Sequence, residues 1–335
     1  MKKRMMKRAA AAAMTGVMAV SMSSVAFAAV SEIDLKKQVT TDGKTYAPAE
    51  TFAFAVTEGT AGTFNGAVVY AGVAGGLVLN ADNDFNFTPG DGDPVAATYE
   101  KPGKITVDAS VFEKPGIYHY EVTEVQGSYE GMDYDNSKRD VYLYVVNGAS
   151  GLEVDSVVTS VDGTKQKSLT FVNVYGDGGE EDKIYDLTVT KKVTGNQGDK
   201  TAAFEFNVGV TGTAGEKYLV EKTDQNNEVT TQTLTSGAEL TKISLKDGES
   251  LHIYGLSAGD TYTVNEEDYT VDGYTTTNGT NNGNLKENGV TIEVTNDKNV
   301  TTPTGIVTTF APYVLMLGAA GAAGGMFLRK KKEDF

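Results

Sequence analysis

The sequence predicts an all-β protein built from two tandem sandwich domains. Short runs rich in Val, Thr, Tyr and Phe, such as Tyr118 to Val125 and Leu169 to Val174, alternate with clusters of Gly, Asn and Asp. This close spacing is typical of β-sandwiches, and helical periodicity is almost absent between the two ends of the chain. The acidic, glycine-rich segment Gly176 to Asp182 interrupts the pattern. We therefore place a boundary there and predict domains over residues 29–178 and 179–299.

The start of the chain predicts a secretory signal peptide over residues 1–28. A basic stretch precedes the apolar run Ala9 to Val20, and Ala26-Phe27-Ala28 supplies the small residues of a cleavage site. These are the three parts of a signal peptide, so we expect the mature chain to begin at Ala29. An uncleaved membrane anchor is the alternative.

The other end, residues 300–335, predicts a sorting signal. Pro303-Thr304-Gly305 precedes the apolar segment 306–328, which is about long enough to cross a bilayer as a helix. A positive cap follows at Arg329 to Lys332, and such a cap stays on the cytoplasmic side. An ordinary membrane anchor is the alternative, in which Pro-Thr-Gly has no role.

This arrangement resembles the sorting signal of Gram-positive surface proteins, which a sortase cleaves between Thr and Gly. The resemblance implies cleavage between Thr304 and Gly305, with transient membrane retention by 306–328 until then. Thr301 and Thr302 stand where the commonest signals have Leu-Pro, which points to a dedicated sortase.

Composition excludes most enzyme classes. The chain has 335 residues, no Cys, two His and a net charge of −16. Between the predicted end segments, 20 basic residues face 43 acidic ones, a net charge of −23. The absence of Cys excludes thiol catalysis and disulfides, and the acidic balance argues against nucleic acid as a partner. We predict no cofactor and no metal, because the loop from Asp82 to Asp93 has Phe87 where a calcium loop needs Gly.

A weak internal repeat places one Lys, one Glu and one Asn on the same kind of strand in each half. Each half opens with the pattern apolar-x-apolar-x-Lys, continues with Tyr-x-Val-x-Glu and closes with an apolar strand that ends in Asn. Side chains two apart share a face, so each polar residue lies on the core side. These residues are Lys37, Glu124 and Asn173 in the first half, and Lys191, Glu266 and Asn296 in the second.

Two interpretations suit such a buried triple. One is a structural Lys–Glu ion pair that is hydrogen-bonded to an Asn. The other is chemical: burial favours a neutral amine beside a carboxylic acid, which polarises the Asn C=O and shuttles protons. The amine then attacks the carboxamide, ammonia leaves, and a Lys–Asn isopeptide bond forms once.

The run from Phe112 to Glu124 resembles a segment of the FctA-type major pilins of streptococci, and so do Leu187 to Phe206 and Leu245 to Ser250. The resemblance covers essentially the whole chain. It implies immunoglobulin-like (Cna-B-type) sandwiches with one intramolecular bond each: Lys37–Asn173 assisted by Glu124, and Lys191–Asn296 assisted by Glu266. The neighbouring Lys36 and Lys192, of opposite parity, are then expected to face solvent.

The same resemblance implies a function. We expect the major structural subunit of a sortase-polymerised pilus, in which Thr304 of one subunit is joined to a Lys of the next. The turn Asp162-Gly163-Thr164-Lys165 makes Lys165 the expected acceptor, with Lys167 the runner-up. The implied partners are a pilus-specific sortase, identical subunits, minor pilins and, through the pilus base, peptidoglycan.

Two other functions remain possible from the residues. One is a wall-anchored minor pilin or adhesin that binds a host ligand, and the other is a secreted hydrolase on a β scaffold. No catalytic constellation supports the hydrolase, so we expect a secreted, wall-anchored structural protein and not an enzyme.

His119, which has the opposite parity to the core-facing Tyr118 and Tyr120, is expected to be exposed.

Overall fold

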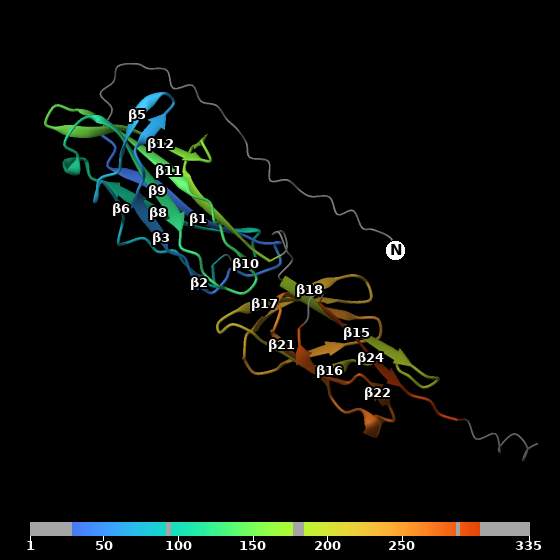
Figure 1. The fold of residues 1–335 in the computed structure, drawn as a ribbon. Helices are drawn as coiled ribbons and strands as arrows, with labels where there is room; N and C mark the ends of the chain where they lie inside the picture. Colours follow the sequence, from blue (N-terminus) through green and yellow to red (C-terminus); the bar gives the residue numbers. More distant parts are fainter. Residues whose placement is uncertain (1–28, 92–94, 177–183, 286–288, 302–335) are drawn as a thin grey trace, which may run out of the picture.

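The computed structural model describes residues 29–91, 95–176, 184–285 and 289–301 (Figure 1). Within these residues the chain consists of β-strands and two short 3-10 helices, η1 (Ala109–Val111) and η2 (Thr270–Asp272), with no α-helix. The prediction of an all-β fold in two parts is confirmed. The predicted domain boundary, the predicted signal peptide and residues 302–335 of the predicted sorting signal lie outside the described residues. No helix in the described part of the chain is long and apolar enough to cross a membrane.

The first half contains two large sheets and one small one. The five-stranded sheet has the order β10 (Met132–Asp133), β14 (Leu169–Tyr175), β1 (Glu32–Thr40), β8 (Thr98–Val107) and β6 (Leu77–Leu79). The seven-stranded sheet runs β13 (Thr164–Gln166), β12 (Leu152–Val161), β11 (Arg139–Asn147), β9 (Gly116–Glu124), β5 (Ala67–Ala71) and β4 (Gly62–Phe64), with β3 (Phe54–Glu58) also paired to β9. β2 (Glu50–Thr51) pairs with β7 (Asn86–Phe87).

The second half contains a six-stranded and a four-stranded sheet. The larger has the order β18 (Val229–Thr235), β17 (Lys217–Thr223), β20 (Ser250–Ser257), β15 (Ile184–Thr194), β24 (Val290–Asp297) and β22 (Thr275–Thr277). The smaller has the order β19 (Thr241–Leu245), β16 (Phe204–Thr211), β21 (Thr261–Glu266) and β23 (Thr280–Asn284).

Each half is a sandwich because strand alternation gives every large sheet one apolar face. Along β11, for example, Val141, Leu143 and Val145 are buried while the residues between them are partly exposed. These side chains join Leu169 and Phe171 of the opposite sheet in one buried cluster. A separate cluster fills the second half. Each half therefore has its own core.

The first and last strands of each half are parallel neighbours. β1 pairs with β14 in the first half, and β15 pairs with β24 in the second. Parallel neighbours cannot be joined by a tight turn, so the rest of each half forms the connection between them. This topology brings the opening and closing strands of each predicted repeat side by side.

The two halves follow one another along the long axis of the molecule (Figure 1). Polar side chains form contacts between them. Tyr129 of the first half donates a hydrogen bond of 2.7 Å to Glu216 of the second, and Tyr46 and Thr233 share one of 2.6 Å. Lys44 also forms an ion pair with Glu221. Several side chains thus fix the joint between the halves.

Candidate functional site

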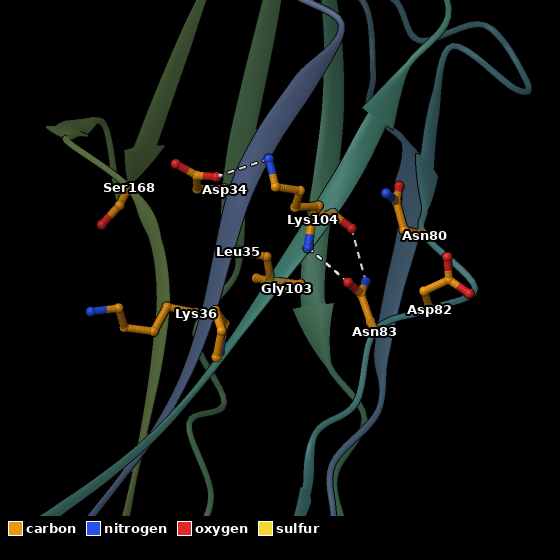
Figure 2. Close-up of a pocket in the computed structure, with 10 residues that line it drawn as sticks. Asp34, Leu35, Lys36, Asn80, Asp82, Asn83, Gly103, Lys104 and Ser168 are labelled. Carbon is orange, nitrogen blue, oxygen red and sulfur yellow. Dashed lines mark hydrogen bonds and ion pairs between the residues drawn. The ribbon is translucent and has the colours of Figure 1, made fainter.

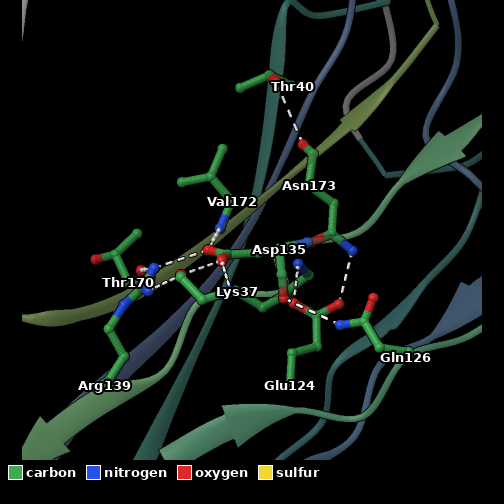
Figure 3. A network of polar contacts seen from close by, with 10 residues as sticks. Lys37, Thr40, Glu124, Gln126, Asp135, Arg139, Thr170, Val172 and Asn173 are labelled. Carbon is green, nitrogen blue, oxygen red and sulfur yellow. Dashed lines mark hydrogen bonds and ion pairs between the residues drawn. The ribbon is translucent and has the colours of Figure 1, made fainter. Parts of the chain in front are cut away.

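The first cluster joins three strands that lie far apart in the sequence (Figure 3). Lys37 of β1 places Nζ 2.7 Å from Oε2 of Glu124 on β9. Asn173 of β14 donates a hydrogen bond of 2.7 Å from Nδ2 to the other oxygen, Oε1. The side chains of Lys37 and Glu124 are fully buried, and so is Asn173. Glu124 therefore bridges the amine and the carboxamide inside the core.

The second cluster contains the corresponding residues of the other half. Lys191 Nζ lies 2.9 Å from Glu266 Oε1 and forms an ion pair with it. Asn296 donates from Nδ2 to the same oxygen over 3.1 Å. The side chains of Lys191 and Glu266 are fully buried, and Asn296 is buried as well. The structure thus brings all six predicted residues together as two triples.

The two clusters share one strand register. Lys37 stands opposite Phe171, two residues before Asn173, and Lys191 stands opposite Val294, two residues before Asn296. Because side chains two apart point to the same face, the Lys and the Asn converge on the core in both halves. The weak sequence repeat therefore corresponds to a repeat in three dimensions.

The glutamates and two phenylalanines are placed equivalently too. Glu124 pairs with Phe54, and Glu266 pairs with Phe206. Two residues before each of these lies a second Phe: Phe52 is 4.5 Å from Lys37 Nζ, and Phe204 is 4.5 Å from Lys191 Nζ, measured to the ring centre. Each amine therefore lies between a carboxylate and an aromatic face, away from water.

Burial shifts the proton equilibrium of these groups toward their neutral forms. It lowers the pKa of Lys37 to about 8 against the opposing effect of Glu124, and it raises the pKa of Glu124. The pKa of Lys191 is also lowered by burial. A neutral amine is a nucleophile and a protonated carboxyl is a proton donor. This environment thus suits amine attack on the adjacent carboxamide.

One expected contact is different. We expected the glutamate to polarise the Asn C=O, but Glu124 and Glu266 both contact the amide nitrogen. In the first half the amide oxygen accepts a 2.8 Å hydrogen bond from the backbone N–H of Asp135 instead. In the second half Asn296 Oδ1 is buried and has no hydrogen-bond partner among the described residues. The glutamate is therefore placed to protonate the departing nitrogen.

The lysines beside the clusters face outward as predicted. The side chains of Lys36 and Lys192 are 44% and 53% exposed and pair with Glu100 and Glu293. Neighbouring lysines of opposite parity are therefore matched controls for the buried ones. They differ in burial but hardly in position along the chain.

The predicted acceptor Lys165 lies on an exposed hairpin. Val161 of β12 pairs with Thr164 of β13 across Asp162 and Gly163, which both have positive φ. Positive φ at both central residues is the signature of a tight type I′ hairpin turn. Lys165 and Lys167 are both exposed, so burial does not discriminate between them. Thr304 and Gly305 lie outside the described residues.

The expectation that His119 is exposed is wrong. The residue is 7% exposed, and its ring stacks on Tyr142 with 4.8 Å between ring centres. Its two ring nitrogens lie 3.1 Å from the carbonyl oxygen of Thr60 and 2.8 Å from Asp140. Strand parity placed His119 on the outer face correctly, but the segment through Gly59 and Thr60 covers that face.

The loop that begins at Asp82, which lacks the Gly of a calcium loop, borders an open groove beside β1 and β8 (Figure 2). Asn83 binds the backbone of Lys104 through both of its amide atoms, and Asp84 accepts from the N–H of Asn86. The Lys104 ammonium pairs with Glu32 at 2.7 Å. These loop side chains are thus engaged by the protein itself.

Comparisons with known proteins find relatives of both halves of the chain. A family model described as a Spy0128-like isopeptide containing domain (FctA) matches residues 33–176, and one described as a domain of unknown function matches 185–298. A pilin of Streptococcus pyogenes serotype M1 is 32% identical over 245 residues, which cover 66% of this chain and 69% of that protein.

Two solved structures of Streptococcus pyogenes proteins are also similar. The crystal structure of a major pilin has a TM-score of 0.59 and 26% identity, covering 81% of this chain and 99% of that one. The T3.2 major pilin has a TM-score of 0.56 and 26% identity, covering 80% and 98%. The likeness extends over both halves of the chain.

Proposed function

Because the chain belongs to the FctA family of isopeptide-containing pilins, it is a pilus backbone subunit, and we propose that each half makes one Lys–Asn isopeptide bond by itself. The bonds join Lys37 to Asn173 and Lys191 to Asn296. The observation that carries this proposal is the repetition of one buried Lys–Glu–Asn geometry, in one strand register, in both halves.

The proposed reaction balances within each triple. The Lys Nζ forms a bond to the Asn Cγ, the bond from Cγ to Nδ2 breaks, and Nδ2 leaves as ammonia. The glutamate takes a proton from the attacking amine and delivers one to the departing nitrogen. Proximity inside the folded core supplies much of the acceleration, so an unfolded chain does not react. Each site acts once, which separates it from a turnover enzyme.

A crosslink at this position suits a fibre under tension. The bond ties the first strand of each half to the last, which are parallel neighbours. Load that enters at one end of a half then passes through the covalent bond to the other end, and the intervening strands are bypassed. The chain has no Cys, so a Lys–Asn bond supplies the constraint that a disulfide supplies elsewhere.

The intact mass of the mature chain, residues 29–304, tests the crosslinks. We expect a deficit of two ammonia molecules in the wild type and of one in Glu124→Ala or Glu266→Ala. Glu121→Ala and Glu267→Ala are matched controls, because these carboxylates pair with exposed lysines, and they should keep both bonds. A wild-type mass equal to that of the unmodified sequence leaves only the structural ion-pair interpretation.

We further propose head-to-tail polymerisation by a pilus-specific sortase. The Thr304–Gly305 bond breaks, and the Thr304 carbonyl carbon is joined to Nζ of Lys165 on the next subunit. Exposure of Lys165 on a short, well-defined hairpin supports this role. Such joining does not close on itself, so it extends into an open fibre. We propose that minor pilins are joined to this fibre and that its base is attached to peptidoglycan.

Polymer formation in cells that express the sortase tests the acceptor. We expect Lys165→Arg to collapse the high-mass ladder to monomer, and Lys167→Arg to leave it intact. Loss of the ladder only in Lys167→Arg reassigns the acceptor. A chain that forms no ladder but is attached to the wall as a monomer is instead a minor pilin or adhesin.

A further inference from the structure

The amide oxygen of Asn173 has a hydrogen-bond donor that the reaction scheme above does not use. The backbone N–H of Asp135 donates to Asn173 Oδ1 over 2.8 Å (Figure 3). Attack of Lys37 Nζ on Asn173 Cγ moves an electron pair onto this oxygen. A donor at this place stabilises the negative charge that develops there, as the donors of an oxyanion hole do.

The side chain of Asp135 locks its own backbone in place. Oδ1 accepts from the backbone N–H of Ser137 over 3.0 Å and from the Ser137 hydroxyl, which closes a tight turn. Oδ2 accepts from Arg139 over 2.7 Å, and both side chains are about nine-tenths buried. The N–H is therefore held in one direction before any reaction occurs.

The same side chains fasten this turn to the strand that carries Asn173. Asp135 Oδ2 accepts from the backbone N–H of Val172 over 3.1 Å, and Arg139 donates to the carbonyl of Thr170 over 2.8 Å. β10 ends at Asp133, so these side chains replace a strand partner along the edge of β14. Donor and amide oxygen therefore move as one unit.

We propose that the turn at Asp135 is an oxyanion-binding element that accelerates formation of the first crosslink. The inference rests on the proposed isopeptide chemistry at Lys37 and Asn173. Lys37 Nζ bonds to Cγ, Oδ1 takes the electron pair, and the Asp135 N–H stabilises it. The electron pair on Oδ1 then re-forms the C=O while the bond from Cγ to Nδ2 breaks. Glu124 delivers the proton with which Nδ2 leaves as ammonia.

The second half provides an internal reference. Asn296 Oδ1 is buried without a hydrogen-bond partner among the described residues. The strand register and the Phe–Lys distance are the same in both halves. The proposal therefore predicts that the Lys37–Asn173 bond forms faster than the Lys191–Asn296 bond in the same molecule.

A pulse of cell-free synthesis of the mature chain, quenched in denaturant at increasing times, measures both rates through the mass of the crosslinked peptides. We expect Asp135→Ala to slow the first bond by about tenfold or more, since one oxyanion donor contributes about 10²–10³ and this change loosens it. Asp135→Asn keeps an acceptor for Ser137 and should fall between wild type and Asp135→Ala. The second bond should form at the wild-type rate in all three.

Two further measurements separate positioning from other roles. Unfolding of the first half in Glu124→Ala with and without Asp135→Ala, neither of which forms the first crosslink, shows whether the turn acts only through stability. Asp135→Ala also removes a charge that raises the pKa of Lys37, so the rate of the first bond is compared at the optimal pH of each variant. Slowing that persists at the optimal pH supports the oxyanion role, whereas slowing that disappears there assigns the effect to the Asp135 charge.

The outcomes are distinct. Wild-type rates of the first bond in both Asp135 variants overturn the proposal, even though the isopeptide function stands. Absence of ammonia loss from the wild type overturns the isopeptide function itself. If Asp135→Ala fails to fold, the Asp135→Asn rate decides, and several-fold slowing of the first bond alone supports the proposal.

Discussion

In the first half Glu124 uses one carboxylate oxygen for Lys37 and the other for Asn173, whereas in the second half Glu266 Oε1 faces both Lys191 and Asn296. The amide oxygens differ as well. Asn173 Oδ1 accepts from Asp135, and Asn296 Oδ1 has no hydrogen-bond partner in the described part of the chain. The strands that carry the Lys and the Asn nevertheless have the same register in both halves.

For the proposed reaction, this difference separates the groups that react from the hydrogen-bond donor that we propose to accelerate the reaction. The amine, the acid and the carboxamide are held by strands, and strands are the part that the two halves share. The donor to the amide oxygen comes from the turn after β10, at the edge of β14. β22 lies at the corresponding edge of β24, but no donor among the described residues reaches Asn296 Oδ1. If the proposed reaction occurs, we expect the two sandwiches to react at different rates because of the segment that covers the edge strand carrying the Asn.

The largest expected effect on stability comes from removing the Asn carboxamide of one half while the other half keeps its own. Asn173→Ala should lower the free energy of unfolding of the first half, and Asn296→Ala that of the second, by about 4–5 kcal/mol each, because the crosslinks close loops of about 136 and about 105 residues. The costs should be nearly equal since loop entropy depends only weakly on length. Calorimetry of the mature chain measures both transitions.

The exposed Asn147 supplies the control for that comparison, because it lies outside the turn at Asp135. Asn147→Ala should leave both transitions in place. An Asn173→Ala chain that unfolds at the wild-type temperature contradicts the view that a covalent bond joins the terminal strands.

The pH dependence of crosslinking sharpens the comparison. The reactive pair must hold one proton, which the carboxyl donates as ammonia leaves. Burial lowers the pKa of Lys37 to about 8, so above this pH the pair loses its last proton and the rate should fall about tenfold per unit. The rate should also fall in acid, below the raised pKa of Glu124, where the amine stays protonated.

Timed mass measurement of both bonds between about pH 5 and about pH 10 checks this profile, because this range extends to both sides of the pKa of Lys37. If the first-half rate continued to rise well above pH 8, proton donation by Glu124 would be wrong.

The smallest expected effect is on the pH dependence of stability, and it comes from the buried carboxyl of Asp260 in the second half. Asp260 is 4% exposed and accepts from the N–H of Ser257 and, at 3.3 Å, from the hydroxyl of Tyr218. Burial, with a contribution from Glu216, raises its pKa to about 6. The folded chain thus binds this proton more tightly than the unfolded chain, so stability falls as pH rises from about 4 to about 6 and then stays level.

Asp260→Asn should abolish that fall. We expect the free energy of unfolding of the second half to rise by about 2 kcal/mol at pH 7 and to change little at pH 4, as denaturant titrations at the two pH values can measure. The exposed Asp268, mutated to Asn, is the control. Equal effects of Asp260→Asn at both pH values are incompatible with this titration.

Much of the site could be predicted from local patterns. Lys37, Glu124 and Asn173 each share parity with apolar neighbours, and alternation along a strand is enough to direct them inward. The signal for Asp135 was also present, because Asp-x-Ser is a common turn sequence. Nothing in that pattern indicates which strand the turn lies against, and so its contact with Asn173 was missed.

The sequence alone determined the fold class, the two-part organisation and the six inward polar residues, because strand parity and turn residues are local properties. Only the tertiary structure decided which atom of each carboxamide meets the glutamate, which amide oxygen has a donor, and that His119 is covered. These features depend on how loops cross strands distant in sequence. A periodic pattern specifies the face on which a side chain lies, and long-range packing specifies what lies against that face.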